Sequence, residues 1–124
     1  MRARKPLIAV VDDDQSVRES LPDLLRELGY GVRAFESAEA FLASGVIEQA
    51  RCLILDIAMP GMSGPELHRR LKAAGQAIRI IFVTAGPDDA VRQQVLSDGA
   101  VECLAKPFSE AQLIAALNAA LAEQ

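Results

Sequence analysis

Five short apolar runs, separated by segments with helical periodicity, set the pattern of this chain. Three of them, LIAVV at 7–11, CLIL at 52–55 and IIFV at 80–83, are nearly continuous, as in strands that are buried on both faces of a parallel sheet. The runs at 30–35 and 101–105 mix polar and apolar residues, which is typical of edge strands. The predicted strands are Leu7–Val11, Tyr30–Phe35, Arg51–Leu55, Arg79–Thr84 and Val101–Ala105.

Helical segments with start signals fill the gaps between these runs. The first is expected to begin with a capping box formed by Ser16 and Glu19 and to end at Gly29. Pro22 lies inside this helix, where it removes one backbone hydrogen bond and is expected to bend the helix. The other predicted helix starts are Ser37, Ser63 with Glu66, Pro87 with Asp88, and Ser109 with Gln112.

The alternation of strands and helices, with short connections, predicts a parallel sheet that is covered by helices on both faces. A length of 124 residues suits one domain with one core. Neither a linker nor an internal repeat divides the sequence. Residues 1–124 are therefore expected to form a single α/β domain.

Composition narrows the class of protein further. A net charge of -4 argues against broad binding to DNA phosphates. No apolar run approaches the roughly 18 residues of a membrane span, and the N-terminus lacks a signal peptide, so a cytoplasmic protein without membrane contact is expected. Cys52 and Cys103 lie on predicted strands two spacings apart, about 10 Å, which is too far for a disulfide.

Polar side chains follow the ends of the central predicted strands. Asp12, Asp13 and Asp14 come directly after the first strand. Asp56 ends the third, Thr84 the fourth, and Lys106 the fifth, so these side chains are expected at one edge of the sheet. Two like charges about 4 Å apart repel by about 4 kcal/mol at an effective dielectric constant near 20. A hard divalent cation with oxygen ligands would relieve that repulsion.

Each of these polar residues also has an ordinary structural interpretation. Asp14 is explained as a helix N-cap, Asp56 as a turn residue, and Lys106 as a surface lysine with a buried stem. What these interpretations leave unexplained is the joint occurrence of the polar residues at successive strand ends. The combination therefore favours a functional site.

The segments VVDDD, LDIAMPGMSG, FVTAG and AKPF, in this order and spacing, closely resemble the receiver domain of two-component response regulators. The resemblance covers about residues 6–121. LDIAMPGMSG resembles most the FixJ type, in which the receiver precedes a helix-turn-helix DNA-binding module. The implied fold is flavodoxin-like, with five parallel strands in the order 2-1-3-4-5.

The resemblance also implies a chemistry. Asp56 would accept a phosphoryl group from the phosphohistidine of a sensor histidine kinase. Mg²⁺ would be held directly by Asp13, Asp56 and the main-chain carbonyl of Ala58, and by Asp12 mostly through bound water. The chain would then be a signalling switch and not an enzyme, apart from its own phosphorylation and slow dephosphorylation.

The implied switch involves residues on the fourth and fifth strands. Lys106 would pair with one phosphoryl oxygen and Thr84 would donate a hydrogen bond to another, and the Lys106–Pro107 peptide bond would be cis. Family members carry an aromatic residue where this chain has Cys103, which leaves the aromatic part of the switch open. The fourth helix, fifth strand and fifth helix would form the output surface and a possible homodimer, and DNA would be contacted only through an output domain outside this chain.

Two other interpretations stay open. Asp12-x-Asp14-x-Ser16 faintly matches the start of haloacid-dehalogenase-like phosphatases, in which Asp12 would be the nucleophile. Those proteins also carry a cap and a late acidic pair, which this sequence lacks. The second alternative is a receiver-like interaction module that never uses phosphate, and Cys103 is the feature that favours it.

Overall fold

The continuous apolar runs form the central strands of one parallel sheet. The computed structural model describes residues 5–86 and 88–122. Its strands are hydrogen-bonded in the order β2-β1-β3-β4-β5, which confirms the flavodoxin-like architecture expected from the sequence. The two mixed runs are the edge strands, as predicted. The strands are β1 (Leu7–Val11), β2 (Gly31–Phe35), β3 (Ala50–Asp56), β4 (Arg79–Thr84) and β5 (Glu102–Ala105).

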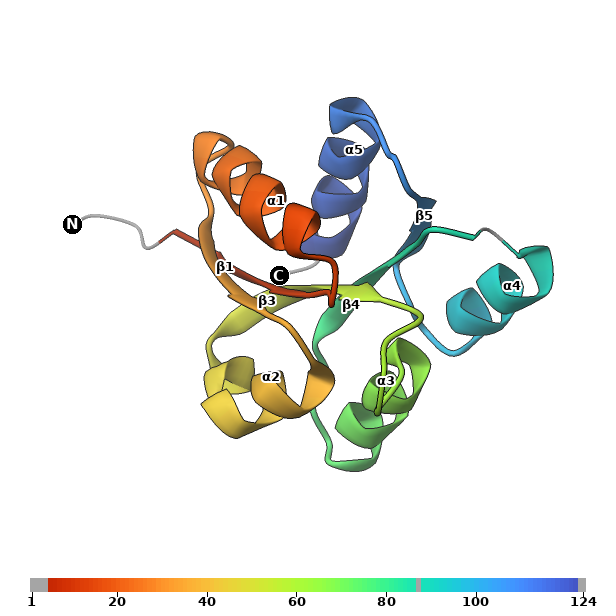
Figure 1. The fold of residues 1–124 in the computed structure, drawn as a ribbon. Helices are drawn as coiled ribbons and strands as arrows, with labels where there is room; N and C mark the ends of the chain where they lie inside the picture. The colour runs from red at the N-terminus through yellow and green to blue at the C-terminus, as the bar shows by residue number, and fades with distance from the viewer. Residues whose placement is uncertain (1–4, 87, 123–124) are drawn as a thin grey trace.

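Helices cover both faces of the sheet (Figure 1). One face is covered by α1 and α5, and the other by α2, α3 and α4. Within the described residues, no helix has the length and apolar character needed to cross a membrane. The helices are α1 (Gln15–Glu27), α2 (Ala38–Ser44), α3 (Gly64–Ala73), α4 (Asp89–Ser97) and α5 (Glu110–Leu121), with a short 3₁₀ helix η1 (Val46–Glu48) before β3.

The sheet separates two apolar cores. Side chains alternate along a strand, so Leu53 and Leu55 of β3 face α2 and α3, while Cys52 and Ile54 face α1 and α5. Cys103 of β5 belongs to the core on the α3 side. The two cysteines therefore lie on opposite faces, and both are buried free thiols, as predicted.

The start of α1 differs from the prediction. Asp14, not Ser16, is the N-cap, because its carboxylate accepts hydrogen bonds from both the amide (2.9 Å) and the hydroxyl (2.8 Å) of Ser16. The predicted capping box of Ser16 and Glu19 is therefore wrong. The N-cap therefore lies two residues earlier than predicted, and Ser16 belongs to the first turn of α1. Pro22 is buried inside α1, which continues as one helix around it.

The other caps agree with the sequence where they are described. Ser63 accepts a hydrogen bond from the amide of Glu66 at the start of α3. Ser109 and Gln112 form a reciprocal capping box at the start of α5. Asp88 caps α4, while Pro87, which was expected to help begin that helix, lies outside the described residues.

Candidate functional site

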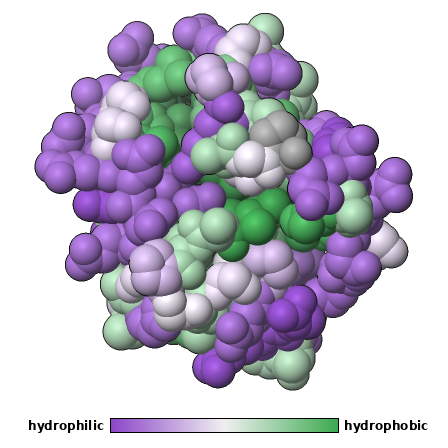
Figure 2. Space-filling model, turned by 45° about the vertical axis from the view of Figure 1, so that its right-hand side comes forward, coloured by the Kyte–Doolittle hydropathy of each residue, from purple (hydrophilic) through white to green (hydrophobic). Residues whose placement is uncertain are grey.

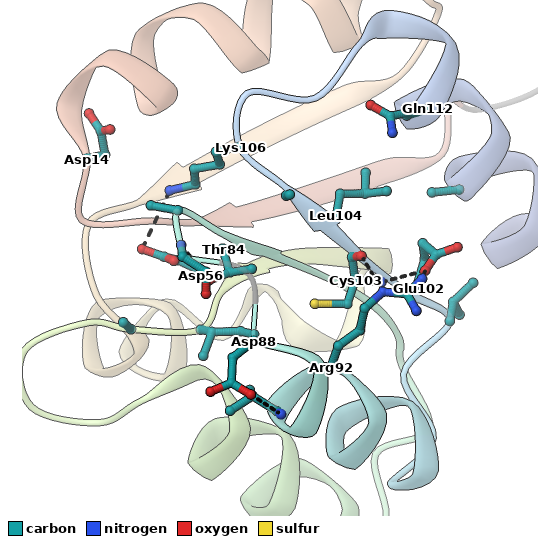
Figure 3. Close-up of a pocket in the computed structure, with 18 of the residues that line it drawn as sticks. Asp14, Asp56, Thr84, Asp88, Arg92, Glu102, Cys103, Leu104, Lys106 and Gln112 are labelled. Carbon is teal, nitrogen blue, oxygen red and sulfur yellow. Dashed lines mark hydrogen bonds and ion pairs between the residues drawn. The ribbon is translucent and has the colours of Figure 1, made fainter.

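The carboxyl ends of the strands bring the predicted polar residues to one edge of the sheet (Figure 3). Asp56 is the last residue of β3 and Thr84 the last of β4, while Lys106 follows β5 directly. Main-chain hydrogen bonds fix these ends. The amide of Ile57 donates to the carbonyl of Val83 (3.0 Å), and the amide of Lys106 donates to the carbonyl of Thr84 (2.8 Å).

Three carboxylates and one ammonium form the centre of the site. Asp12 and Asp56 are buried and Asp13 is exposed, and one carboxylate oxygen of each lies within 4.8 Å of the others. Lys106 Nζ lies 2.8 Å from Asp12 Oδ2 and 3.7 Å from Asp56 Oδ2. One positive charge thus faces three negative charges, so the cluster keeps a surplus of negative charge.

The donor set fits a hard divalent cation. Asp12 Oδ1 accepts a hydrogen bond from the amide of Asp14 at 2.9 Å. Asp12 Oδ2 has the ion pair with Lys106 but no hydrogen bond among the described residues. All the candidate ligand atoms are oxygens, which Mg²⁺ prefers. Ala58, whose carbonyl was predicted as a further ligand, also lines this site.

Burial and charge shift the ionisation of the two central groups. Burial raises the pKa of Asp56 to about 7, the negative charge of Asp12 adds to that shift, and Lys106 opposes it. For Lys106, burial favours the neutral amine. Its close ion pair with Asp12 and its attraction to Asp56 outweigh burial and raise the pKa of Lys106. Asp56 is therefore costly to ionise in the metal-free site.

We expect this cost to appear as pH-dependent stability of the metal-free protein. The pKa of Asp56 rises on folding from 3.8 to about 7, so its stabilising contribution is full below about pH 4 and is lost as the pH rises through about 7. Urea denaturation in EDTA across this range, followed by circular dichroism, measures the trend. Asp56→Asn should be less sensitive to pH, and an equal slope in both proteins would contradict the expectation.

The hydroxyl of Thr84 is engaged by the loop that follows β4. Its Oγ1 lies 3.3 Å from both the carbonyl oxygen and the amide nitrogen of Gly86, donating to the first and accepting from the second. Cys103 is buried on β5 and pairs in register with Phe82. A thiol therefore occupies the position where the sequence resemblance implied an aromatic ring. The peptide bond between Lys106 and Pro107 is cis.

A groove of about 900 Å³ extends from Asp56 along β5, between α4 and α5. Figure 2 shows a hollow with hydrophobic residues at its floor and hydrophilic residues around it. Arg92 of α4 crosses toward β5, where it donates to Glu102 Oε1 (2.8 Å) and to the carbonyl of Cys103 (3.4 Å). The acid cluster and the surface of α4, β5 and α5 are thus continuous.

Two contacts near the site were not predicted. Arg18 Nη1 of α1 donates to the carbonyl of Asp12 at 3.0 Å, and Glu39 Oε2 of α2 accepts from the amide of Met62 at 3.1 Å. Glu39 and Met62 are separated by 23 residues, and no motif joins them. Only the helical phase of α1, which places Arg18 one turn after Asp14, could have indicated the first contact.

Comparisons with known proteins agree with this geometry. The family model of the response regulator receiver domain matches residues 8–118. The response regulator protein TodT of Pseudomonas putida is 40% identical over 121 residues, 98% of this chain and 53% of TodT. The transcriptional regulatory protein FixJ of Azorhizobium caulinodans is 41% identical over 114 residues, 92% of this chain and 54% of FixJ.

A solved structure shares the fold. The response regulator StyR superposes with a TM-score of 0.88 at 45% identity, and the match covers 97% of this chain and 61% of StyR. This chain spans about half the length of TodT and FixJ.

Proposed function

This chain belongs to the response regulator receiver family, and on that premise we propose that Asp56 accepts a phosphoryl group from the phosphohistidine of a sensor histidine kinase. The observation that carries the proposal is the placement of Asp56. It is a buried carboxylate at the end of a central strand, held between other acids and the ammonium of Lys106. Receiver domains act as signalling switches, and we infer that role for residues 1–124 as one domain.

In the proposed step, a carboxylate oxygen of Asp56 attacks phosphorus in line with the leaving nitrogen. The new P–O bond forms as the P–N bond of phosphohistidine breaks, and the electron pair of that bond stays on the imidazole. Lys106 would pair with a phosphoryl oxygen, and the hydroxyl of Thr84 would leave Gly86 and donate to another. Phosphoryl transfer depends mainly on such positioning and charge neutralisation.

The site fits Mg²⁺, and we assign its binding to Asp13, Asp56 and the carbonyl of Ala58, with Asp12 acting mostly through water. The ion would supply positive charge beside the phosphoryl oxygens. The surplus of carboxylates over ammonium groups and the incompletely satisfied Oδ2 atom of Asp12 support this assignment. Mg²⁺ usually keeps several of its waters, so a few protein oxygens are enough.

Intact mass measurement after incubation with acetyl phosphate tests the function. We expect one phosphoryl adduct with Mg²⁺ present, and formation slowed by about 100-fold or more in EDTA, because a major electrostatic stabiliser is then removed. An adduct that forms equally well in EDTA would contradict the Mg²⁺ assignment. If neither acetyl phosphate nor a sensor kinase phosphorylates the chain, the phosphate-independent interaction module is the better description.

The consequence proposed for phosphorylation is a change at the surface of α4, β5 and α5. Inward movement of Thr84 would alter the loop before α4, and Arg92 joins that helix to β5 beside Cys103. We infer that this surface controls a transcriptional output in the cytoplasm, with homodimerisation as one route. Contact with DNA would come through an output domain, as expected for the FixJ type.

A further inference from the structure

The loop between β3 and α3, residues 57–63, carries the carbonyl of Ala58 that is assigned to Mg²⁺. Main-chain hydrogen bonds close the base of this loop. The amide of Ile57 donates to Val83 of β4 (3.0 Å), and the amide of Gly64 donates back to the carbonyl of Ile57 (3.0 Å). The side chains of Met59 and Met62 are buried in the core beneath the loop.

A carboxylate from another element holds the far side of the same loop. Glu39, in the first turn of α2, accepts a hydrogen bond from the amide of Met62 at 3.1 Å. The neighbouring Gly61 adopts a φ of +76°, and a Cβ atom there would lie 2.8 Å from Glu39 Oε2. The carboxylate of Glu39 therefore accepts a main-chain hydrogen bond from Met62 and occupies the space that a side chain at Gly61 would need.

We propose that Glu39 is a positioning residue for phosphoryl transfer, which holds the β3–α3 loop at Met62 and thereby sets the carbonyl of Ala58 for the metal. This inference rests on the proposed function. Mg²⁺ demands near-ideal octahedral geometry, so a small displacement of one ligand weakens binding. A hydrogen bond to an ionised carboxylate is stronger than one between neutral groups, which suits it to fixing a loop.

Because Glu39 is exposed, an effect of its removal on the loop can be distinguished from an effect on the stability of the fold. Its side chain lies at the surface and contributes little to either core, so its removal should leave the fold intact. The alternative explanation is a general effect of its negative charge on a nearby cation. Glutamine distinguishes the two, because its amide oxygen still accepts from Met62 while the charge is lost.

The test measures Mg²⁺ affinity by calorimetric titration for the full chain and for Glu39→Ala, Glu39→Gln and Glu48→Ala. Loss of a contact that orients a ligand typically weakens metal affinity by 10-fold to 100-fold. We expect a loss of roughly 10-fold for Glu39→Ala and of at most about 3-fold for Glu39→Gln. Glu48→Ala, which removes an equal charge from an exposed position in η1, should bind Mg²⁺ as the native chain does.

Two further readouts complete the test. The amide proton resonance of Met62 should move in Glu39→Ala and much less in Glu39→Gln, while the urea midpoints of all variants stay together. Unchanged Mg²⁺ affinity in Glu39→Ala, with native phosphorylation intact, would overturn the positioning role alone. Equal losses in the alanine and glutamine variants would replace it with a charge effect. Absence of Mg²⁺ binding in the native chain would overturn the proposed function, and the role of Glu39 with it.

Discussion

Asp56→Asn is expected to abolish phosphoryl uptake, with the rate of adduct formation from acetyl phosphate falling at least about a thousand-fold. Asparagine has nearly the same shape as aspartate and should fit the same buried position at the end of β3. Its amide is a poor nucleophile, and it loses the charge that faces Lys106 at 3.7 Å. Intact mass measurement with Mg²⁺ present, as for the native chain, gives the result directly.

Asp13→Asn is the informative companion to this variant. It removes a proposed metal ligand but leaves the nucleophile, so its adduct should form more slowly and still form. A phosphoryl adduct that persists in Asp56→Asn would place the nucleophile elsewhere. Fragment masses would then show whether Asp12 carries the phosphate, as the haloacid-dehalogenase alternative requires.

Gly64→Ala is expected to destabilise the fold by about 3 kcal/mol, the upper part of the usual range for overpacking. A Cβ atom at this position would lie 2.2 Å from the main-chain oxygen of Asp56 and 3.0 Å from Cε1 of Phe82. Neither neighbour has room to move, because Asp56 ends a central strand and the ring of Phe82 is fully buried. Urea denaturation followed by circular dichroism measures the loss.

Gly31→Ala is a matched control for that experiment. Its new Cβ would meet Leu7 Cδ1 at 3.6 Å, an ordinary contact, so its stability should stay within about 1 kcal/mol of the native chain. A Gly64→Ala protein as stable as Gly31→Ala would mean that the start of α3 leaves room for a methyl group beside the main-chain oxygen of Asp56. Because the clash involves Asp56 itself, Gly64→Ala should also slow phosphorylation in whatever fraction folds.

The strands were the most predictable part of this fold. Each of the five runs predicted a strand to within one residue at either end. The three central strands were the clearest, because burial on both faces demands apolar residues at nearly every position. The grouping of Asp12, Asp56 and Lys106 followed from strand order alone, since the carboxyl ends of parallel strands share an edge. The competition between neighbouring residues for the N-cap position of α1 was harder to predict. Asp14 and Ser16 are both good N-caps, and sequence gives no measure of which one captures the free amide.

Contacts between elements far apart in the sequence could not be predicted, for a different reason. The hydrogen bond from Met62 to Glu39 depends on how α2 packs against the β3–α3 loop. Packing of that kind produces no periodic pattern in the sequence. The same holds for Arg92, which reaches both Glu102 and the carbonyl of Cys103 only because α4 lies beside β5. The sequence indicated that an aromatic ring is missing at Cys103 but not the groove that runs past it.

The ion pairs of Lys106 link the stability of the edge strand β5 to the charge of the acid cluster. Lys106 follows β5, an edge strand of four residues, yet its ammonium contacts acids at the ends of β1 and β3, nearer the middle of the sheet. Local opening of the edge strand therefore carries an electrostatic cost that the acid cluster sets. Neutralising those acids would lower the electrostatic cost of opening β5. Moving β5 away from β4 would leave the repulsion between the acids uncompensated.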